Sequence, residues 1–353
     1  MDDTTINPAI DNPASPPPRR TRATLLDVAR HLGLSKATVS KVLNMTPELC
    51  PVAPATQQRV RDAVAELGYR PSFQARSLAN RRTGMVAIAY EAPLGAVPRG
   101  VYWDVVDRLD ELLGANGLCP TFIHTHGRHR NATEMLGEER FDACISLGTL
   151  PKSVLDVLQA ENIPTVLINA DADPIWSGVN VNDVGGCEQL MRHLIGLGHK
   201  RIAYNAGRYA NTHSSAIDRA TTYTRMMHEA GLEPDKPFVG SVTEFVDRSI
   251  TGPYKPTAVV DFEHWTAVIV LQQLWKRGLR VPDDMSVATF NDVYPVTLVI
   301  PPLTTVAVFP PEMSTAAVQM LTELIDNPSL PPRRVVFEEQ LIVRESTAAP
   351  KTS

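Results

Sequence analysis

Residues 24–44 have the sequence TLLDVARHLGLSKATVSKVLN, which predicts two short helices joined by a glycine turn. Thr24 and Asp27 have the spacing of a capping box, with a hydroxyl that accepts from the third helical residue and a carboxylate at the positive end of the helix. Gly33 can adopt the left-handed conformation that ends the first helix. Ser35 then caps the second helix, so both helix starts are marked in the sequence.

Each of these two helices has an apolar face. It consists of Val28, Ala29 and Leu32 in the first helix, and of Val39, Val42 and Leu43 in the second. The outward face of the second helix carries Lys36, Ala37, Ser40, Lys41 and Asn44, a set that fits the major groove of DNA. A third helix is expected over about Thr56–Leu67. The pattern predicts a helix-turn-helix, although any two short amphipathic helices around a glycine resemble one.

The charge of the chain is divided between its two ends. Residues 1–82 hold 12 Lys or Arg and 7 Asp or Glu, whereas the remaining residues hold 22 and 32. A polyanion-binding module joined to an acidic body would divide the charge in this way, and chance asymmetry is the alternative. The run SFQARSLANRR at residues 72–82 is basic and too short and polar to form a stable helix by itself.

The first 21 residues are rich in Pro, Asn, Asp and Ser and poor in large apolar residues, which predicts a disordered tail. Its arginines could touch phosphates, but a solvated linker is the favoured interpretation. The N-terminus has no basic segment followed by an apolar stretch, and no apolar run approaches the ~18 residues of a membrane span. We therefore expect a chain that is neither exported nor membrane-spanning.

The cysteines are widely scattered and form no CxxC pair that would suggest zinc. We expect Cys50, Cys119, Cys144 and Cys187 to be small buried hydrophobic side chains in a reducing compartment.

Beyond Thr83 short apolar strands alternate with helices, a pattern typical of parallel sheets with helices on both faces. Because the alternation restarts after Asn180, we expect two doubly wound α/β lobes. With 353 residues the chain exceeds the ~250–300 at which single cores stop growing. Ligands of such sheets bind at the carboxyl ends of the strands, so a cleft between the lobes is the expected site.

Several stretches, taken in order, resemble the lactose-repressor/galactose-repressor (LacI/GalR) family of bacterial transcriptional regulators. They are TLLDVA (24–29), GLS (33–35), TVSKVLN (38–44), ARSL (75–78), LGHKRIA (197–203), PPLTTV (301–306) and REST (344–347). No single stretch is decisive, but their order and spacing together are specific. The resemblance covers about Thr24 to Thr347.

The resemblance implies a small all-α helix-turn-helix headpiece, a hinge helix that folds in the minor groove, and a core of the type I periplasmic-binding-protein-like class. Lys36 and Ala37 match positions at which the family reads operator bases, and Leu78 matches a leucine that wedges between central base pairs. The other positions implied or predicted to contact DNA are Thr24, Ser35, Thr38, Ser40, Lys41, Asn44, Ala75 and Arg76.

For the effector, Arg219 matches an arginine that commonly holds the ligand in this family. Asn169 and Asn291 correspond to ligand positions in the two lobes, Asn291 at a position that is often acidic. Tyr102 lies where members often stack a ring on the ligand, and packing without a ligand is an equal alternative.

The chain departs from the family pattern at two places. Glu263 and His264 replace an Asn-Asp pair of sugar-binding members, so sugar recognition cannot be transferred, although a ligand role for both is favoured over packing. The loop at residues 45–51 is longer than usual, and Ala53 replaces the hydroxyl cap of the third helix. His124, His126 and His129 could form a metal or anion site, but their spacing favours a solvated loop.

The sequence therefore predicts a ligand-responsive transcriptional regulator, in the first instance a repressor, that binds a palindromic operator as a homodimer. The expected parts are a disordered tail at 1–21, the headpiece at 22–69, a hinge helix and linker at 70–83, the two-lobed core at 84–347 and a C-terminal tail at 348–353. We expect cytoplasmic localisation at the nucleoid, no membrane partner, no metal and no cofactor beyond a small-molecule effector, for which a sugar or related metabolite is one candidate.

Two other classes of protein fit the sequence less well. A periplasmic binding protein would need a signal peptide and would have no use for the basic headpiece. A doubly wound enzyme would need a nucleophile, an acid and base pair or a cofactor loop, and none is found in the sequence.

Overall fold

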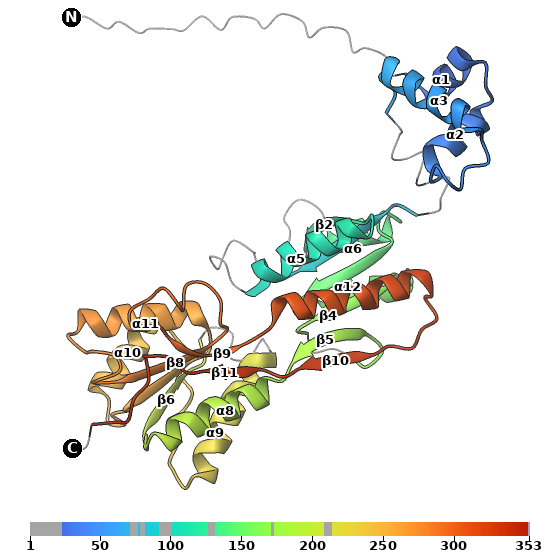
Figure 1. The fold of residues 1–353 in the computed structure, drawn as a ribbon. Helices are drawn as coiled ribbons and strands as arrows, with labels where there is room; N and C mark the ends of the chain where they lie inside the picture. Colours follow the sequence, from blue (N-terminus) through green and yellow to red (C-terminus); the bar gives the residue numbers. More distant parts are fainter. Residues whose placement is uncertain are drawn as a thin grey trace, which may run out of the picture. The chain divides into compact units, whose positions relative to one another are not determined.

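The computed structural model describes residues 23–70, 77, 82–91, 101–125, 131–170, 173–207 and 214–351. The chain divides into two compact units, residues 1–81 and 82–353, which are described separately (Figure 1).

The first unit is a bundle of three helices, α1 (Leu25–Leu32), α2 (Lys36–Asn44) and α3 (Pro54–Glu66). The capping box of Thr24 and Asp27 is present, and Ser35 Oγ accepts from the Thr38 amide at 3.0 Å. Gly33 has a φ of 65°, the left-handed conformation that was expected at the end of α1. These predicted local features are confirmed. The buried core consists of Val28, Ala29, Val39, Val42, Cys50, Val60 and Ala63.

The long loop between α2 and α3 is fastened by Gln57, a buried residue of α3 that the sequence analysis did not single out. Its side-chain amide donates to the carbonyl oxygens of Pro47 and Val52 at 3.1 and 2.8 Å. Ala53 provides no side-chain cap for α3, as its residue type implied, and Pro54 occupies the first helical position. Gln57 therefore orders the loop that precedes α3, a helix whose N-terminus has no hydroxyl cap.

The second unit begins with a lobe built on a six-stranded parallel sheet in the order β10-β5-β4-β3-β1-β2. The strands are β1 (Met85–Tyr90), β2 (Cys119–His124), β3 (Ala143–Leu147), β4 (Thr165–Ile168), β5 (Ser177–Val181) and β10 (Arg334–Phe337). Alternate side chains of β1 face opposite layers: Val86 and Ile88 pack under α5 (Val101–Ala115) and α12 (Pro310–Asp326), while Ala87 and Ala89 pack under α6 (Ala132–Gly137) and α7 (Lys152–Ala160). We call this part the N-terminal lobe.

The C-terminal lobe has a five-stranded sheet in the order β11-β9-β8-β7-β6, parallel except for β11. Its strands are β6 (Ile202–Asn205), β7 (Ala258–Asp261), β8 (Ser286–Phe290), β9 (Thr304–Ala307) and β11 (Gln340–Ile342). One face is covered by α8 (Asp183–Gly196) and α9 (Ser214–Glu229), the other by α10 (Val242–Thr251) and α11 (His264–Lys276). The prediction of two doubly wound lobes is confirmed.

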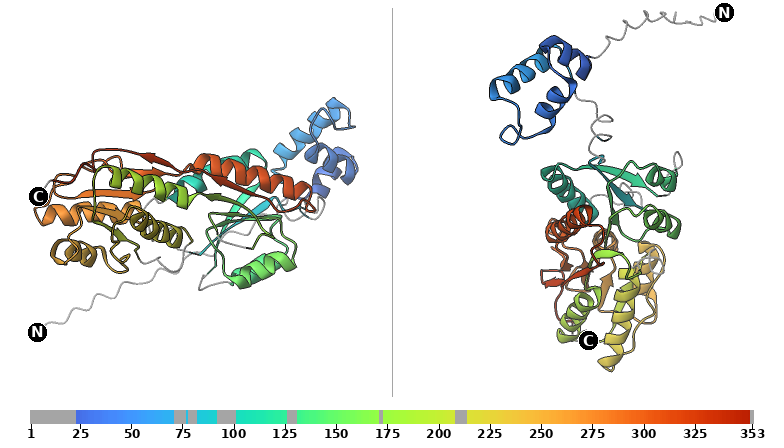
Figure 2. Two further views of the ribbon diagram at one scale, coloured as in Figure 1. Left: turned by 90° about the horizontal axis from the view of Figure 1, so that it is seen from below. Right: turned by 90° about the vertical axis from the view of Figure 1, so that its right-hand side faces the viewer.

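The chain passes between the lobes three times, because α12 and β10 return to the N-terminal lobe. The first crossing joins β5 to α8, and the second joins β9 to α12. The third joins β10 to β11 through Glu338 and Glu339. Figures 1 and 2 show α12 beside α5, although the two helices are far apart in the sequence. The restart after Asn180 was expected, whereas this return was not.

Among the residues that the structure describes, no helix is long and apolar enough to cross a membrane. Three of the cysteines are buried, but Cys119 is exposed at the start of the edge strand β2, so the expectation of burial was wrong for that residue. A cysteine at an edge strand can have one face in solvent, and the apolar pattern of β2 does not distinguish its two faces.

Candidate DNA-binding and effector sites

The outward face of α2 exposes Lys36, Ala37, Lys41 and Asn44, while Thr38 and Ser40 are half-buried. Within the described part of the chain neither lysine has an ion-pair partner, so both ammonium groups point to solvent without an internal carboxylate. The Asn44 amide donates to Ser40 Oγ at 3.1 Å, and the Ser35 and Thr38 hydroxyls lie 2.8 Å apart. These contacts hold the polar side chains of α2 in fixed positions.

Thr24 serves the cap of α1. Its hydroxyl donates to Asp27 Oδ2 at 2.7 Å and accepts from the Asp27 amide at 3.3 Å. The hydrogen bonds that the Thr24 hydroxyl and backbone amide donate to the Asp27 carboxylate lower the pKa of Asp27. The hydroxyl proton of Thr24 is therefore used inside the headpiece. Toward DNA, the Thr24 hydroxyl oxygen can only accept a hydrogen bond. Ala75, Arg76 and Leu78 lie outside the described residues.

In the second unit two asparagines directly follow strands. Asn169 follows β4 with a φ of 50°, and Asn291 follows β8 with a φ of 71°. Asparagine tolerates this left-handed conformation better than most residues do. The parallel sheets thus place one amide at the carboxyl end of a strand in each lobe, where ligands of open α/β sheets bind.

The structure brings Tyr102 and Asn169 together through a side-chain hydrogen bond. The Asn169 amide also donates to Ser215 Oγ on α9 at 3.4 Å, so these residues join the two lobes. Burial raises the pKa of Tyr102 to about 12, and the nearby charge of Asp183 adds to this effect. Gly148, with a φ of 79°, leaves room for the phenol, because an added Cβ would lie 3.0 Å from the Tyr102 hydroxyl. Ser215 and Gly148 were not predicted, since both depend on contacts between distant elements.

Arg219 is buried among protein groups rather than held open. Its Nη2 lies 2.6 Å from Asp183 Oδ1 and 3.1 Å from Glu339 Oε1. Its Nη1 donates to the carbonyl of Phe262 at 3.2 Å, and its guanidinium carbon lies 4.1 Å from the centre of the Phe290 ring. The family resemblance implies an arginine that offers its donors to a ligand, whereas Arg219 lies beneath the ends of β7 and β8 with both terminal nitrogens bound to protein groups.

Glu263 and His264 begin α11 directly beyond β7. The buried Asp261 carboxylate fixes this start by accepting from the Glu263 amide at 3.2 Å and from the Thr266 hydroxyl, and it also accepts from Asn205 at 2.8 Å. Burial raises the pKa of Asp261 to about 7, and the hydrogen bonds from Thr266 and Asn205 oppose that rise.

The side chain of His264 is buried, and its ring lies 5.8 Å from that of Trp265. Trp265 in turn meets the ring of Tyr294 edge to face at 6.3 Å. Asn291 donates from its backbone to Val306 at 2.8 Å, and the neighbouring Asp292 is paired with Arg344. The predicted effector residues therefore fall into groups: Tyr102 with Asn169, Arg219 with two acids, and Glu263 with His264 at the start of α11.

Comparison with known proteins connects these features. Residues 24–72 match the model of bacterial regulatory proteins of the lacI family, and residues 191–347 match the periplasmic binding protein-like domain. The transcriptional repressor PurR of Photobacterium profundum is 28% identical over 92% of this chain and 98% of its own length. Among solved structures, the Lac repressor dimer bound to operator and an anti-inducer has a TM-score of 0.81 at 22% identity, covering 93% of this chain and 100% of the other.

A complex of the transcriptional regulator CelR with cellobiose has a TM-score of 0.68 at 26% identity and covers 92% of this chain and 100% of the other. The family and its relatives are transcriptional regulators, which favours that class over the periplasmic binding protein and the enzyme. The headpiece of this chain therefore matches the lacI family of bacterial regulatory proteins, and residues 191–347 of its core match the periplasmic binding protein-like domain.

Proposed function

We propose that this transcriptional regulator is a repressor that binds a palindromic operator as a homodimer and is switched by a small molecule held between its lobes. The observation that carries the proposal is the pair of unneutralised lysines on α2 of a helix-turn-helix, joined in one chain to a core whose strand ends carry polar side chains from both lobes. The expected location is the bacterial cytoplasm, at the nucleoid.

On the DNA side, Lys36 can reach guanine acceptors and the methyl group of Ala37 can meet thymine. Ser35, Thr38, Ser40, Lys41 and Asn44 would contact phosphates and groove edges, with Thr24 acting only as an acceptor. Two headpieces related by a two-fold axis require two half-sites related in the same way, so the operator is a palindrome. The hinge helix at 70–83, with Ala75, Arg76 and Leu78, would enter the minor groove between the half-sites.

On the effector side, the proposed residues are Tyr102, Asn169, Arg219, Glu263, His264 and Asn291. The amides of Asn169 and Asn291 can both donate and accept hydrogen bonds, and Tyr102 can stack on a ring. This combination suits a neutral molecule with several hydroxyl groups, which supports a sugar or a related metabolite. CelR, with its bound cellobiose, supports the same class of ligand.

The test uses the purified full-length protein. DNA is selected from a random pool, and a panel of sugars, sugar acids and nucleobases is screened by thermal shift, because a ligand that binds only the folded state raises its melting temperature. We expect a palindromic consensus and at least one stabilising neutral compound. If no sequence is enriched over the starting pool, the proposal fails at the DNA-binding step.

A further inference from the structure

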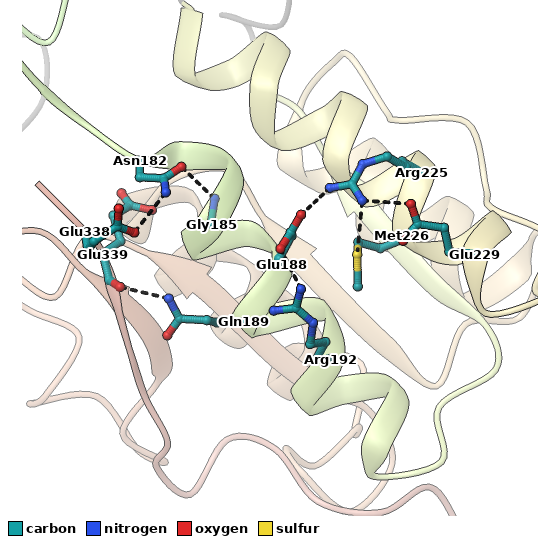
Figure 3. A network of polar contacts seen from close by, with 10 residues as sticks. All are labelled: Asn182, Gly185, Glu188, Gln189, Arg192, Arg225, Met226, Glu229, Glu338 and Glu339. Carbon is teal, nitrogen blue, oxygen red and sulfur yellow. Dashed lines mark hydrogen bonds and ion pairs between the residues drawn. The ribbon is translucent and has the colours of Figure 1, made fainter. Parts of the chain in front are cut away.

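Two of the three crossings between the lobes are tied to each other. Asn182 ends the first crossing and its side-chain amide donates to Glu338 Oε2 at 2.9 Å, while its backbone amide donates to Phe337 O at 2.8 Å. Gln189 of α8 donates to the Glu339 carbonyl at 2.9 Å and accepts from the Leu341 amide at 3.2 Å. Figure 3 shows α8 lying along the segment that holds Glu338 and Glu339.

Arg219 reaches both of these crossings from α9. Its Nη2 contacts Asp183, the first residue after one crossing, and Glu339, the last residue of the other. The side chains of Arg219, Asp183 and Glu339 are 3%, 7% and 0% exposed, so this contact lies out of solvent. One side chain of the C-terminal lobe therefore holds two of the three connections to the N-terminal lobe.

The sequence of α8 makes room for this arrangement. A Cβ added at Gly186 would lie 1.8 Å from Glu339 Oε2, so only glycine allows the carboxylate to approach the first turn of α8. Gly185 serves the cap in a similar way, because an added Cβ would lie 2.7 Å from Asn182 Nδ2. The two glycines of Asp183-Val184-Gly185-Gly186 thus admit the side chains that join the crossings.

The cluster contains one guanidinium and two carboxylates. Glu339 Oε2 is buried and has no hydrogen-bond partner among the described residues. Burial raises the pKa of Glu339 to about 7; Arg219 opposes the rise, and the charges of Asp183 and Glu338 add to it. The other titratable groups that interact with the cluster are Cys187 on α8, Tyr204 on β6 and Tyr102 on α5.

We infer that Arg219, Asp183 and Glu339 form a clamp that fixes the angle between the lobes, with Arg219 as its central positioning residue. Both of its terminal nitrogens already bind protein groups. An ionised Glu339 completes the clamp, and a protonated Glu339 weakens its hold on Arg219. The clamp would set the angle between the lobes in the proposed effector switch. Its test uses neither DNA nor effector, so the clamp can be wrong while the proposed function is right.

The test measures the distance between the lobes in the full-length protein by double electron–electron resonance. Cys119 is exposed on the N-terminal lobe and takes one nitroxide, and Lys236→Cys, at an exposed position of the C-terminal lobe, takes the other. Labelled protein is diluted with unlabelled protein so that each assembly holds one labelled chain. Spectra are recorded one pH unit below and one above the Glu339 pKa of about 7.

We expect a narrow distance distribution above this pKa and a broader, shifted one below it. Glu339→Gln, which keeps an acceptor for Arg219 but cannot ionise, should give the broad distribution at both pH values. Glu188→Gln is the matched control, because Glu188 also lies on α8 but pairs with Arg192 and Arg225 outside the cluster (Figure 3). It should retain the pH response of the parent.

A distribution of the parent protein that does not change with pH would overturn the clamp, and this result needs no substitution in the cluster. A Glu339→Gln protein that responds to pH as the parent does would overturn it as well. Both outcomes leave the operator and effector experiments of the proposed function unaffected.

Discussion

Lys36 and Ala37 stand side by side at the exposed start of α2, where one residue brings charge and the other a methyl group. Each base contact of this kind discriminates by about 1–3 kcal/mol. Exchanging the two residues should therefore change the preferred half-site while binding is retained. Selection from random half-sites measures this preference, with Lys152→Ala on the core as the control. An unchanged consensus would remove both residues from base recognition.

Arg219 has a different role as a buried cation. Removing it leaves two buried carboxylates without a partner, and breaking a buried pair in this way costs about 3–5 kcal/mol. Arg219→Ala should lower the free energy of unfolding of the core by that amount in a denaturant titration. Arg225→Ala should change it little, because Arg225 makes its ion pairs at the surface. Equal effects of the two substitutions would contradict the burial argument.

Asp261 makes the stability of the core depend on pH. Its pKa is raised from 3.8 to about 7 by burial, so the folded state binds this proton more tightly than the unfolded state. The stabilisation it brings is complete below pH 3.8 and is lost as the pH rises through 7, at up to about 1.4 kcal/mol per pH unit.

Asp261→Asn should remove this decline, so the variant gains stability relative to the parent as the pH rises towards 7. Denaturant titrations of both proteins across this range measure the difference. Asp284→Asn is a control of opposite sign, because the hydrogen bond from Lys351 lowers the pKa of Asp284 and its contribution is lost as the pH falls. A constant difference between Asp261→Asn and the parent would contradict the account.

At the scale of elements, interactions between near neighbours could be predicted and those between distant segments could not. The caps of α1 and α2 depend on residues three positions apart, so the sequence contains them completely. The return of α12 and β10 to the N-terminal lobe depends on the sheet edge at β5 being free to pair with β10. The local sequence pattern does not contain this information. The site divides in the same way: Asn169 was expected from the family resemblance, whereas the contacts of Ser215 and Glu339 become visible only in the fold.

Leu78, in the segment expected to form a hinge helix, lies outside the described residues, and its expected role comes from the family resemblance. Unstacking a base step costs a few kcal/mol, so insertion of Leu78 is favourable only when the dimer holds two such helices at the right separation. Leu78→Ala should weaken specific binding far more than non-specific binding and should reduce bending of the operator. Operator titrations and fluorescence-based bending measurements decide this.

Arg76→Ala is the matched comparison for Leu78→Ala. Loss of a phosphate contact weakens binding to all sequences alike. It also reduces the slope of the logarithm of affinity against the logarithm of salt concentration by about one. If Leu78→Ala behaves in the same way as Arg76→Ala, the segment is only a charged linker.

At the scale of the whole molecule, the proposed function divides the work between a basic headpiece that would bind DNA and an acidic core that would sense a small molecule. The core has the parts of a switch: two lobes, three crossings, and a buried cluster that holds two of these crossings. A ligand can shift such a two-state equilibrium only by the difference between its affinities for the two states. The effector must therefore bind one arrangement of the lobes more tightly than the other.

The most direct test of the account is a titration of the selected operator with the full-length protein, with and without the compound found by thermal shift, followed by fluorescence anisotropy. The account predicts sequence-specific binding whose affinity changes about 5–150-fold when the compound is added, the usual range of allosteric coupling. The same compound should leave binding to a scrambled operator unchanged. Specific binding with the same affinity in the presence and absence of the compound would contradict the claim that the core controls the headpiece.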